Sequence, residues 1–277
     1  MTQDLIIFTD LDGSLLNHED YSFREALPAL ARIKRMTIPL VFVTSKTRGE
    51  VEILQEEIGI REPFIVENGG AIFFPAGYRG RTIATGRSLN GYTVIELGVS
   101  YARIREFLTQ FSSRFGIMGF GDWSVAEIAS RTGLSADQAT LAGQREFTEP
   151  FVTGSGADMG ALQALAEAHG LKITRGGRFY HLIGAAQDKG MAVRTTREIF
   201  SRYLGGTPLA IGLGDSENDL SMFTQVDIPV LIPRPDGTRL NLRLPRLVVA
   251  HSPGCRGWNA AMEDILDEFA TETARNI

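Results

Sequence analysis

Short apolar runs alternate with longer amphipathic segments over residues 5–67, and the same alternation returns after residue 186. A strand-length apolar run followed by a helix-length segment is the repeating unit of a parallel sheet. We therefore expect an α/β protein whose core is a doubly wound, Rossmann-like parallel sheet. The elements predicted for this core are strands 5–9, 39–43, 63–67, 208–213, 228–232 and 246–250, and helices 23–36, 47–58, 188–203, 217–225 and 257–273.

The stretch between these two halves has a different pattern. Residues 92–97 alternate like a strand with one exposed face, two short helices are predicted within 124–142, and 178–183 has the pattern of another strand. These elements predict an inserted α+β unit that divides the core in sequence. We expect the core to comprise residues 1–84 and 186–277, and the inserted domain to comprise residues 85–185.

Composition narrows the classes of function. A chain of 277 residues that is 43% apolar can bury a substantial core. Its net charge of −5, its sequence pI of about 5.5 and the lack of a Lys/Arg-rich block argue against nucleic acid or an anionic membrane as the main partner. The sequence shows neither a secretory signal nor an apolar segment near the ~20 residues of a membrane span, so a cytoplasmic protein is expected. Its single cysteine, Cys255, excludes an intrachain disulfide and a thiolate metal cluster.

Two acidic signatures follow predicted strands at opposite ends of the chain. Asp10 and Asp12 come after the first strand, and Asp215 comes after strand 208–213. In open parallel sheets the crevice at the carboxyl ends of the strands binds ligands, so these carboxylates should converge there and should require a cation. Asp215, supported by Asn218 or Asp219, offers the hard oxygen ligands that suit Mg²⁺.

Ser216 and Asp219 also fit a helix capping box, with Ser216 as the capping residue and Asp219 reaching back. This structural interpretation and a metal-binding one can both hold. Capping leaves Asp215 without an explanation.

Asp10 and Asp12 together can support phosphate ester hydrolysis. One ionised carboxylate can attack phosphorus and form an aspartyl-phosphate, while the other protonates the leaving oxygen and later activates water. The two roles require different environments, because neighbouring like charges push one pKa upward. The spacing leaves open which residue has which role.

Five further positions are candidates for phosphate or ligand contact. Lys189 begins a helix, where a cation calls for a nearby anion; the alternative is a solvated lysine paired only with Asp188. Thr44 lies at a strand tip before a helix whose free N–H groups can hold phosphate oxygens. Asn68 ends a third strand, where ligand contact and an ordinary turn are equally compatible. For Ser45 and Thr47 the alternative is a plain helix N-cap.

In this order, the four signatures resemble those of phosphatases of the haloacid dehalogenase (HAD) superfamily over essentially the whole chain. They are Asp10-x-Asp12-Gly13-Ser14, Thr44, Lys189, and Gly214-Asp215-Ser216-x-Asn218-Asp219. The resemblance implies that Asp10 is the nucleophile and Asp12 the acid/base. It also implies that Asp215 holds Mg²⁺ with Asp10 and the Asp12 carbonyl, and that Thr44 and Lys189 contact the phosphoryl group. Ser14 stands where many relatives have Thr, which keeps the hydroxyl.

The position of the insertion, between Thr44 and Lys189, resembles the large α+β cap of the sugar-phosphatase branch, which governs substrate specificity. Local motifs at 44–48, 67–70, 145–151 and 254–259 are similar to those of the mannosyl-3-phosphoglycerate phosphatase family. The implied substrate is a small molecule that carries a phosphate, a carboxylate and a sugar. The implied substrate-binding candidates, each of which has a surface or structural alternative, are Ser45, Lys46, Thr47, Arg48, Asn68, Arg145, Glu146, Thr148, Arg178 and His181.

We therefore expect a Mg²⁺-dependent phosphatase that acts on a glycosyl-3-phosphoglycerate beneath a mobile cap. A phosphatase of the same architecture for a simpler sugar phosphate is the nearest alternative. A phosphomutase is disfavoured by the late position of the insertion. A non-catalytic sugar-phosphate sensor is disfavoured by the intact acidic pair, because a sensor does not need a nucleophile.

Overall fold

The first predicted strand, β1 (Leu5–Thr9), is buried along its whole length at the centre of the larger of two sheets. In the computed structural model, which describes residues 4–175, 178–203 and 207–275, this sheet has nine strands in the order β13-β12-β11-β1-β2-β3-β4-β6-β5. β1 pairs in parallel with β2 (Leu40–Val43) and with β11 (Leu209–Gly214). The remaining parallel strands are β3 (Phe64–Val66), β12 (Ile228–Leu231) and β13 (Val248–Val249).

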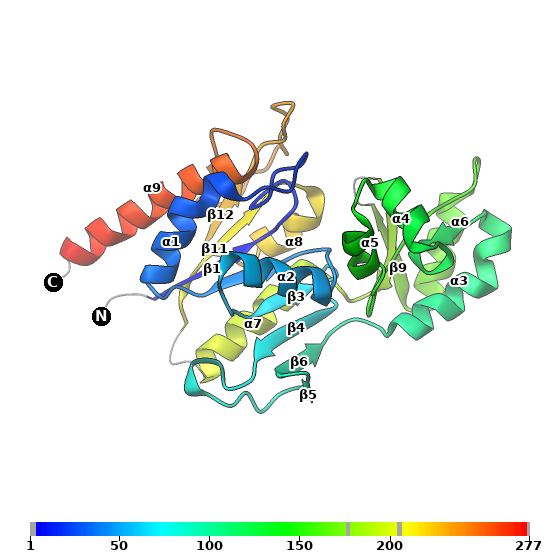
Figure 1. The fold of residues 1–277 in the computed structure, drawn as a ribbon, viewed down its shortest axis with the longest axis horizontal. Coiled ribbons are helices and arrows are strands. Elements are labelled where there is room, and N and C mark those ends of the chain that lie inside the picture. The colour runs from blue at the N-terminus through cyan, green and yellow to red at the C-terminus, as the bar shows by residue number, and fades with distance from the viewer. Residues whose placement is uncertain (1–3, 176–177, 204–206, 276–277) are drawn as a thin grey trace.

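Helices cover both faces of this sheet, because its strands carry apolar side chains on both sides (Figure 1). Alternate residues of β1 separate the two clusters: Ile7 packs with the helices of one face and Ile6 with those of the other. On the first face lie α1 (Leu27–Arg35), α2 (Arg48–Ile58) and α9 (Gly254–Arg275), with the short η1 (Arg24–Ala26). On the second lie α7 (Lys189–Tyr203) and α8 (Leu220–Phe223), preceded by η4 (Glu217–Asp219). The expected α/β, doubly wound core is confirmed.

The middle of the chain forms a second lobe, drawn in green in Figure 1. Within the described residues its antiparallel sheet has four strands in the order β7-β8-β10-β9. The strands are β7 (Met118–Gly119), β8 (Glu149–Val152), β9 (Leu171–Arg175) and β10 (Tyr180–Gly184). One apolar cluster joins this sheet to α3 (Tyr101–Phe115) and α6 (Met159–Ala168), and another includes α4 (Val125–Thr132) and α5 (Ala136–Ala142). We call residues 101–184 the cap.

The structure differs from the predicted start of the inserted domain at residue 85. β5 (Arg87–Leu89) and β6 (Tyr92–Glu96) extend the core sheet beside β4 (Ala71–Pro75), and none of them pairs with the second sheet. The reason is a tight turn at residues 67–70 that returns the chain antiparallel to β3. Of the helices described, none combines the length and the apolar character that crossing a bilayer requires.

Candidate active site

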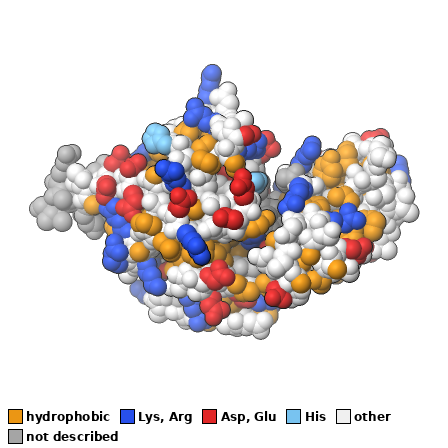
Figure 2. All heavy atoms as spheres, turned by 45° about the horizontal axis from the view of Figure 1, so that its top comes forward, with side chains coloured by type: hydrophobic (Ala, Val, Ile, Leu, Met, Phe, Trp, Pro, Cys, Tyr) orange, Lys and Arg blue, Asp and Glu red, His pale blue; other side chains and the backbone are white. Residues whose placement is uncertain are grey.

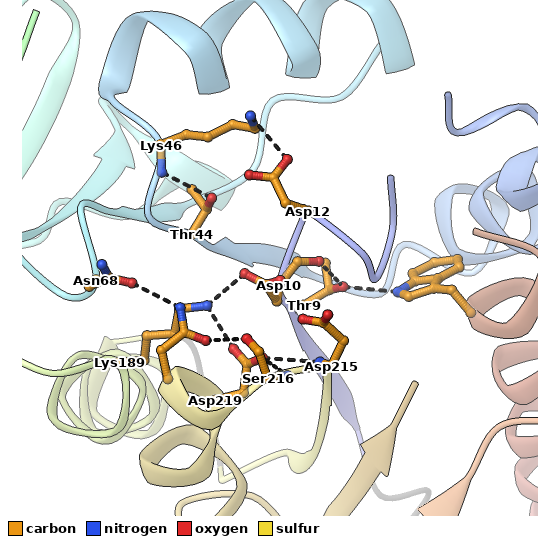
Figure 3. Close-up of polar contacts among 12 residues, drawn as sticks. Thr9, Asp10, Asp12, Thr44, Lys46, Asn68, Lys189, Asp215, Ser216 and Asp219 are labelled. Atoms are coloured by element: carbon orange, nitrogen blue, oxygen red, sulfur yellow. Dashed lines mark hydrogen bonds and ion pairs between the residues drawn. The ribbon is translucent and has the colours of Figure 1, made fainter. Parts of the chain in front are cut away.

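Three carboxylates meet where β1 and β11 end. Asp10 directly follows β1, and Asp215 directly follows β11, which is hydrogen-bonded to β1. Asp219 comes from the η4 turn after them. Each residue contributes a carboxylate oxygen to a group whose members lie within 4.8 Å of one another, and the three are only 5%, 7% and 0% exposed (Figure 3). The convergence expected from the two acidic signatures is therefore present for Asp10 and Asp215, whereas the carboxyl group of Asp12 lies outside the group.

Lys189 is the cation inside this group. Its ammonium donates to Oδ1 of Asp10 at 2.6 Å and to Oδ1 of Asp219 at 2.7 Å, and the residue is 1% exposed. A solvated lysine paired only with Asp188 is therefore the wrong alternative. One ammonium among three carboxylates leaves an excess of negative charge in a buried site.

The pKa values of the carboxyl groups reflect that excess. Burial raises the pKa of Asp10 well above its usual range; Lys189 opposes this, while Asp219 and Asp215 add to it. Burial and the neighbouring Asp219 raise the pKa of Asp215 to about 6. Such a group is stabilised by a further cation that binds hard oxygen ligands.

The backbone is shaped to pass close to Asp215. Gly13 has φ +81°, and a Cβ at this position would lie 2.6 Å from Oδ2 of Asp215. A residue with a side chain would therefore displace that carboxylate as well as strain the turn. The chain turns sharply at Gly13, and the carboxylates of Asp10 and Asp215 beside this turn form a donor set that fits Mg²⁺.

Asp219 and Asn218 have supporting contacts rather than free ligand atoms. Oδ2 of Asp219 accepts hydrogen bonds from the backbone N–H groups of Asp215 and Ser216, both at 3.1 Å, while its Oδ1 accepts from Lys189. The capping box predicted for Ser216 and Asp219 is present. Asn218 accepts from the Ser216 hydroxyl at 2.6 Å and donates to Asn68 at 3.3 Å. These two residues orient Asp215 and the loop around it.

The carboxyl group of Asp12 points away from this group, toward Lys46 (Figure 3). Oδ1 of Asp12 lies 3.0 Å from the Lys46 ammonium, which is also 3.6 Å from Glu50 and 4.9 Å from the ring centre of Tyr21. Burial lowers the pKa of Lys46, but Asp12 and Glu50 outweigh it and hold that pKa above its ordinary value. Asp10 is thus buried against Lys189, whereas the Asp12 side chain is 33% exposed beside Lys46. The two carboxyls have the different environments that two chemical roles require.

Thr44 lies at the end of β2 and is buried, and its hydroxyl accepts a hydrogen bond from the Lys46 N–H at 3.1 Å. Thr47 is the N-cap of α2 and forms a capping box with Glu50. The Thr47 hydroxyl also donates to the Leu141 carbonyl of the cap at 3.0 Å. The N-cap alternative is therefore correct for Thr47, and we do not propose it as a substrate ligand.

The polar atoms of five other candidates, Arg48, Glu146, Arg178, Arg145 and Thr148, have partners within the described part of the protein. Arg48 pairs with Glu52 and Glu146, each at 3.2 Å. Arg178 donates to the carbonyl of Thr132 at 2.6 Å and so holds the cap together. The last two, Arg145 and Thr148, bind the core and are described below. Substrate contact is not proposed for these side chains.

One ring nitrogen of His181, Nδ1, is buried without a hydrogen-bond partner among the described residues. Burial and the positive charge of Arg145 lower the pKa of His181 to about 3. The imidazole is therefore neutral at physiological pH, and Nδ1 can bind a ligand hydroxyl.

This low pKa predicts a dependence of stability on pH. Between pH 7 and pH 5 the unfolded chain protonates His181 near its ordinary pKa, but the folded chain does not, so acid favours unfolding. We expect the free energy of unfolding of His181→Gln to fall less than that of the wild type over this range, by about 1 kcal/mol. Urea unfolding at the two pH values measures this difference. Equal losses would contradict it, and His251→Gln, which alters an exposed histidine, is the control.

Two functional contacts were not predicted from the sequence. Trp258, on α9, donates through Nε1 to the Thr9 hydroxyl at 2.9 Å, and that hydroxyl donates to the Asp10 carbonyl at 2.8 Å. Glu67, at the end of β3, accepts hydrogen bonds from the cap. A buried polar residue beside an apolar strand is the signal that singles out Glu67. The Trp258 contact has no local signal, because it spans 249 positions.

Comparisons with known proteins agree with this geometry. A protein-family model described as haloacid dehalogenase-like hydrolase matches residues 7–85. The chain is 52% identical over 265 residues to the glucosyl-3-phosphoglycerate/mannosyl-3-phosphoglycerate phosphatase of Persephonella marina. The alignment covers 96% of this chain and 98% of that relative. A protein of the same name from Methanococcoides burtonii is 42% identical over 265 residues, with 94% and 97% covered. A crystal structure of a Thermoplasma acidophilum protein has the same fold, with a TM-score of 0.66 at 18% identity and 98% and 99% covered.

Proposed function

This chain belongs to the haloacid dehalogenase-like hydrolases and is a phosphatase, and from that premise we propose that its substrate is glucosyl-3-phosphoglycerate or mannosyl-3-phosphoglycerate. Relatives at 52% and 42% identity over nearly the whole chain bear both substrates in their name. The observation that most supports phosphate ester hydrolysis is the buried group of charged side chains where β1 and β11 end. Its members are Asp10, Asp215, Asp219 and Lys189.

The reaction takes place in two steps. A carboxylate oxygen of Asp10 attacks phosphorus as the ester P–O bond breaks, and Asp12 gives its proton to the departing oxygen. In the second step Asp12 takes a proton from water, whose oxygen attacks the phosphorus of the aspartyl-phosphate. The acyl phosphate bond breaks, which frees Asp10 and inorganic phosphate. The Lys189 ammonium, 2.6 Å from Oδ1 of Asp10, favours the ionised carboxylate that attacks phosphorus and so supports Asp10 as the nucleophile.

The transferring phosphoryl group must be held and its charge neutralised. Lys189, already between Asp10 and Asp219, supplies a positive charge beside the nucleophile. The Thr44 hydroxyl lies at the start of the loop that leads to α2 and can donate to a phosphate oxygen. We propose Mg²⁺ as the cofactor, held by Asp10, Asp215 and the Asp12 carbonyl, with Asn218 and Asp219 in support; when bound, it neutralises further phosphoryl charge.

The rest of the substrate is proposed to lie between the core and the cap. Figure 2 shows the molecule hollowed between the two lobes, with Lys and Arg side chains on the cap side of the hollow. Ser45, Lys46 and Asn68 are the core residues that we propose for substrate contact, and His181 is the cap residue. An acidic sugar derivative fits this site, because Lys46 can meet an anion and the free Nδ1 of His181 can bind a hydroxyl.

A phosphate-release assay tests both substrate and metal. We expect kcat/KM for a glycosyl-3-phosphoglycerate to exceed that for hexose phosphates by about 100-fold or more, since the carboxylate and the sugar both add contacts. Removing Mg²⁺ with a chelator should reduce release to a few per cent, and adding Mg²⁺ should restore it. Equal rates on hexose phosphates would favour the simpler sugar phosphatase. An isomerised product without free phosphate would indicate a mutase. Tight binding without turnover would indicate a sensor. Turnover in the presence of chelator would refute the assigned metal site.

A further inference from the structure

Glu67 is a fully buried core carboxylate whose side-chain hydrogen bonds all go to the cap. Oε1 accepts from the backbone N–H of Glu146 at 2.8 Å. Oε2 accepts from the N–H of Phe147 at 3.1 Å and from the Thr148 hydroxyl at 2.7 Å. Glu67 has φ +51°, in the left-handed region that is uncommon for residues other than glycine. Glu67 thus combines a strained backbone with a buried carboxylate, and that carboxylate binds one cap segment, residues 146–148.

Arg145 forms the reverse connection. It extends from the cap to the core, where Nη1 donates to the Ser45 carbonyl at 2.7 Å. The same guanidinium donates to the Ala142 carbonyl at 2.8 Å, which anchors it in the cap. The positive charge of Arg145 lowers the pKa of Glu67, although burial raises it more. The core carboxylate of Glu67 therefore binds the cap, and beside it the cap guanidinium of Arg145 binds the core.

Both connections reach the loop at residues 44–46. Its three consecutive carbonyls are each held by a different donor: that of Thr44 by the Asn68 N–H at 2.8 Å, that of Ser45 by Arg145, and that of Lys46 by the Glu67 N–H at 3.0 Å. This loop carries the hydroxyl proposed to bind the phosphoryl group. A movement of the cap that breaks the Glu67 contacts also removes Arg145 from the loop.

We propose that Glu67 is a positioning residue that couples docking of the cap to the geometry of the 44–46 loop, so that the loop takes its catalytic form only while the cap is docked. The inference rests on the proposed function only in taking Thr44 as a phosphoryl ligand. When the cap leaves, the buried carboxylate loses three donors at once, which makes docking cooperative. Displacing a phosphate-holding group by about 1 Å costs roughly 100-fold in rate, so a coupling of this kind acts on kcat.

Glu149 provides a matched control. It is also fully buried and also accepts three hydrogen bonds, from the Tyr101 hydroxyl at 2.6 Å, from Arg105 at 2.9 Å and from the Gly121 N–H at 2.8 Å. All three donors lie inside the cap. Replacing Glu149 therefore tests the loss of a buried carboxylate network without any loss of contact between cap and core.

The experiment compares Glu67→Gln with Glu149→Gln in the full chain. A glutamine amide at position 67 keeps one acceptor oxygen but puts an NH2 donor in place of the other, so at least one N–H of the cap loses its acceptor and the contact with the cap segment is weakened. With p-nitrophenyl phosphate and Mg²⁺ we expect kcat to fall about 10- to 100-fold in Glu67→Gln with little change in KM, and to stay within about twofold of wild type in Glu149→Gln. Hydrogen–deuterium exchange should rise at both 44–50 and 141–148 in Glu67→Gln, but only within the cap in Glu149→Gln.

The outcomes separate this inference from the proposed function. Hydrolysis of p-nitrophenyl phosphate but not of glycosyl-3-phosphoglycerates would overturn the proposed substrate and leave the coupling supported by exchange. Unchanged kcat, or unchanged exchange at 44–50, in Glu67→Gln would overturn the coupling, as would equal effects of the two variants. If Glu67→Gln does not fold, Thr148→Val removes one of the three donors; a smaller rise in exchange at 44–50 supports the coupling, and no rise overturns it.

Discussion

Replacing Asp10 by Asn is expected to reduce phosphate release by at least about 1,000-fold, because an amide neither attacks phosphorus nor leaves as a carboxylate. The substitution preserves the shape of a side chain that is 5% exposed. Burial raises the pKa of Asp10 well above its usual range, so the charged form opposes folding at neutral pH. We therefore expect a midpoint of thermal unfolding equal to or above that of the wild type.

Steady-state phosphate release and thermal unfolding measure these two effects on the same samples. Asp236→Asn, which alters an exposed loop carboxylate, is the control and should keep wild-type turnover. Retention of more than a tenth of wild-type kcat by Asp10→Asn would remove Asp10 from the nucleophile role. A rate lost together with the folded state would require the Asp10→Glu variant in its place.

Replacing Lys189 by Met should produce the largest change in stability. The ammonium is the only cation described within hydrogen-bonding distance of both Asp10 and Asp219, and without it two buried carboxylates lose their charged partner. Removing one member of a buried ion pair costs about 3–5 kcal/mol. We expect a loss of that size in the free energy of unfolding measured by urea in the presence of chelator, together with loss of turnover. Lys34→Met removes only an exposed contact to the Gly59 carbonyl and should cost less than about 1 kcal/mol.

A double-mutant cycle sharpens this prediction. If uncompensated charge causes the loss, Asp10→Asn combined with Lys189→Met should be more stable than Lys189→Met alone, because one of the two stranded carboxylates is gone. Added Mg²⁺ should likewise raise the unfolding midpoint of Lys189→Met more than that of the wild type. Additive effects and no response to Mg²⁺ would show that packing around the lysine stem, rather than charge, accounts for the loss.

The core was predictable because its strands are buried on both faces and read as continuous apolar runs. The predicted strand 5–9 and helix 47–58 correspond closely to β1 and α2. The strand at 92–97 was also predicted, but its place in the core sheet was not, because periodicity reports which face is buried and not which strand is the neighbour. The helix α3 was not predicted, although the spacing of Ile104, Phe107 and Leu108 has a helical period. The strand–helix alternation of the core does not extend to this segment and so gave no reason to expect a helix there.

In the candidate site, too, the residues of the core could be predicted from the sequence and those of the cap could not. Asp10 and Asp215 were predictable because each directly follows a strand, and adjacent parallel strands end at the same edge. The roles of the cap residues were not, because whether an arginine faces solvent, substrate or a carbonyl depends on packing between the lobes. Arg145 and Arg178 show this, since each donates to backbone carbonyls far away in sequence.

The hydrogen-bond chain from Trp258 through Thr9 to the carbonyl of Asp10 has a consequence for the timing of synthesis. The reacting carboxyl leaves the ribosome long before the indole that holds its backbone, because Thr9 and Trp258 are 249 positions apart. β11, which supports β1 from the other side, also emerges late. A growing chain therefore carries its nucleophile without the contacts that hold it in place until β11 and α9 have been made.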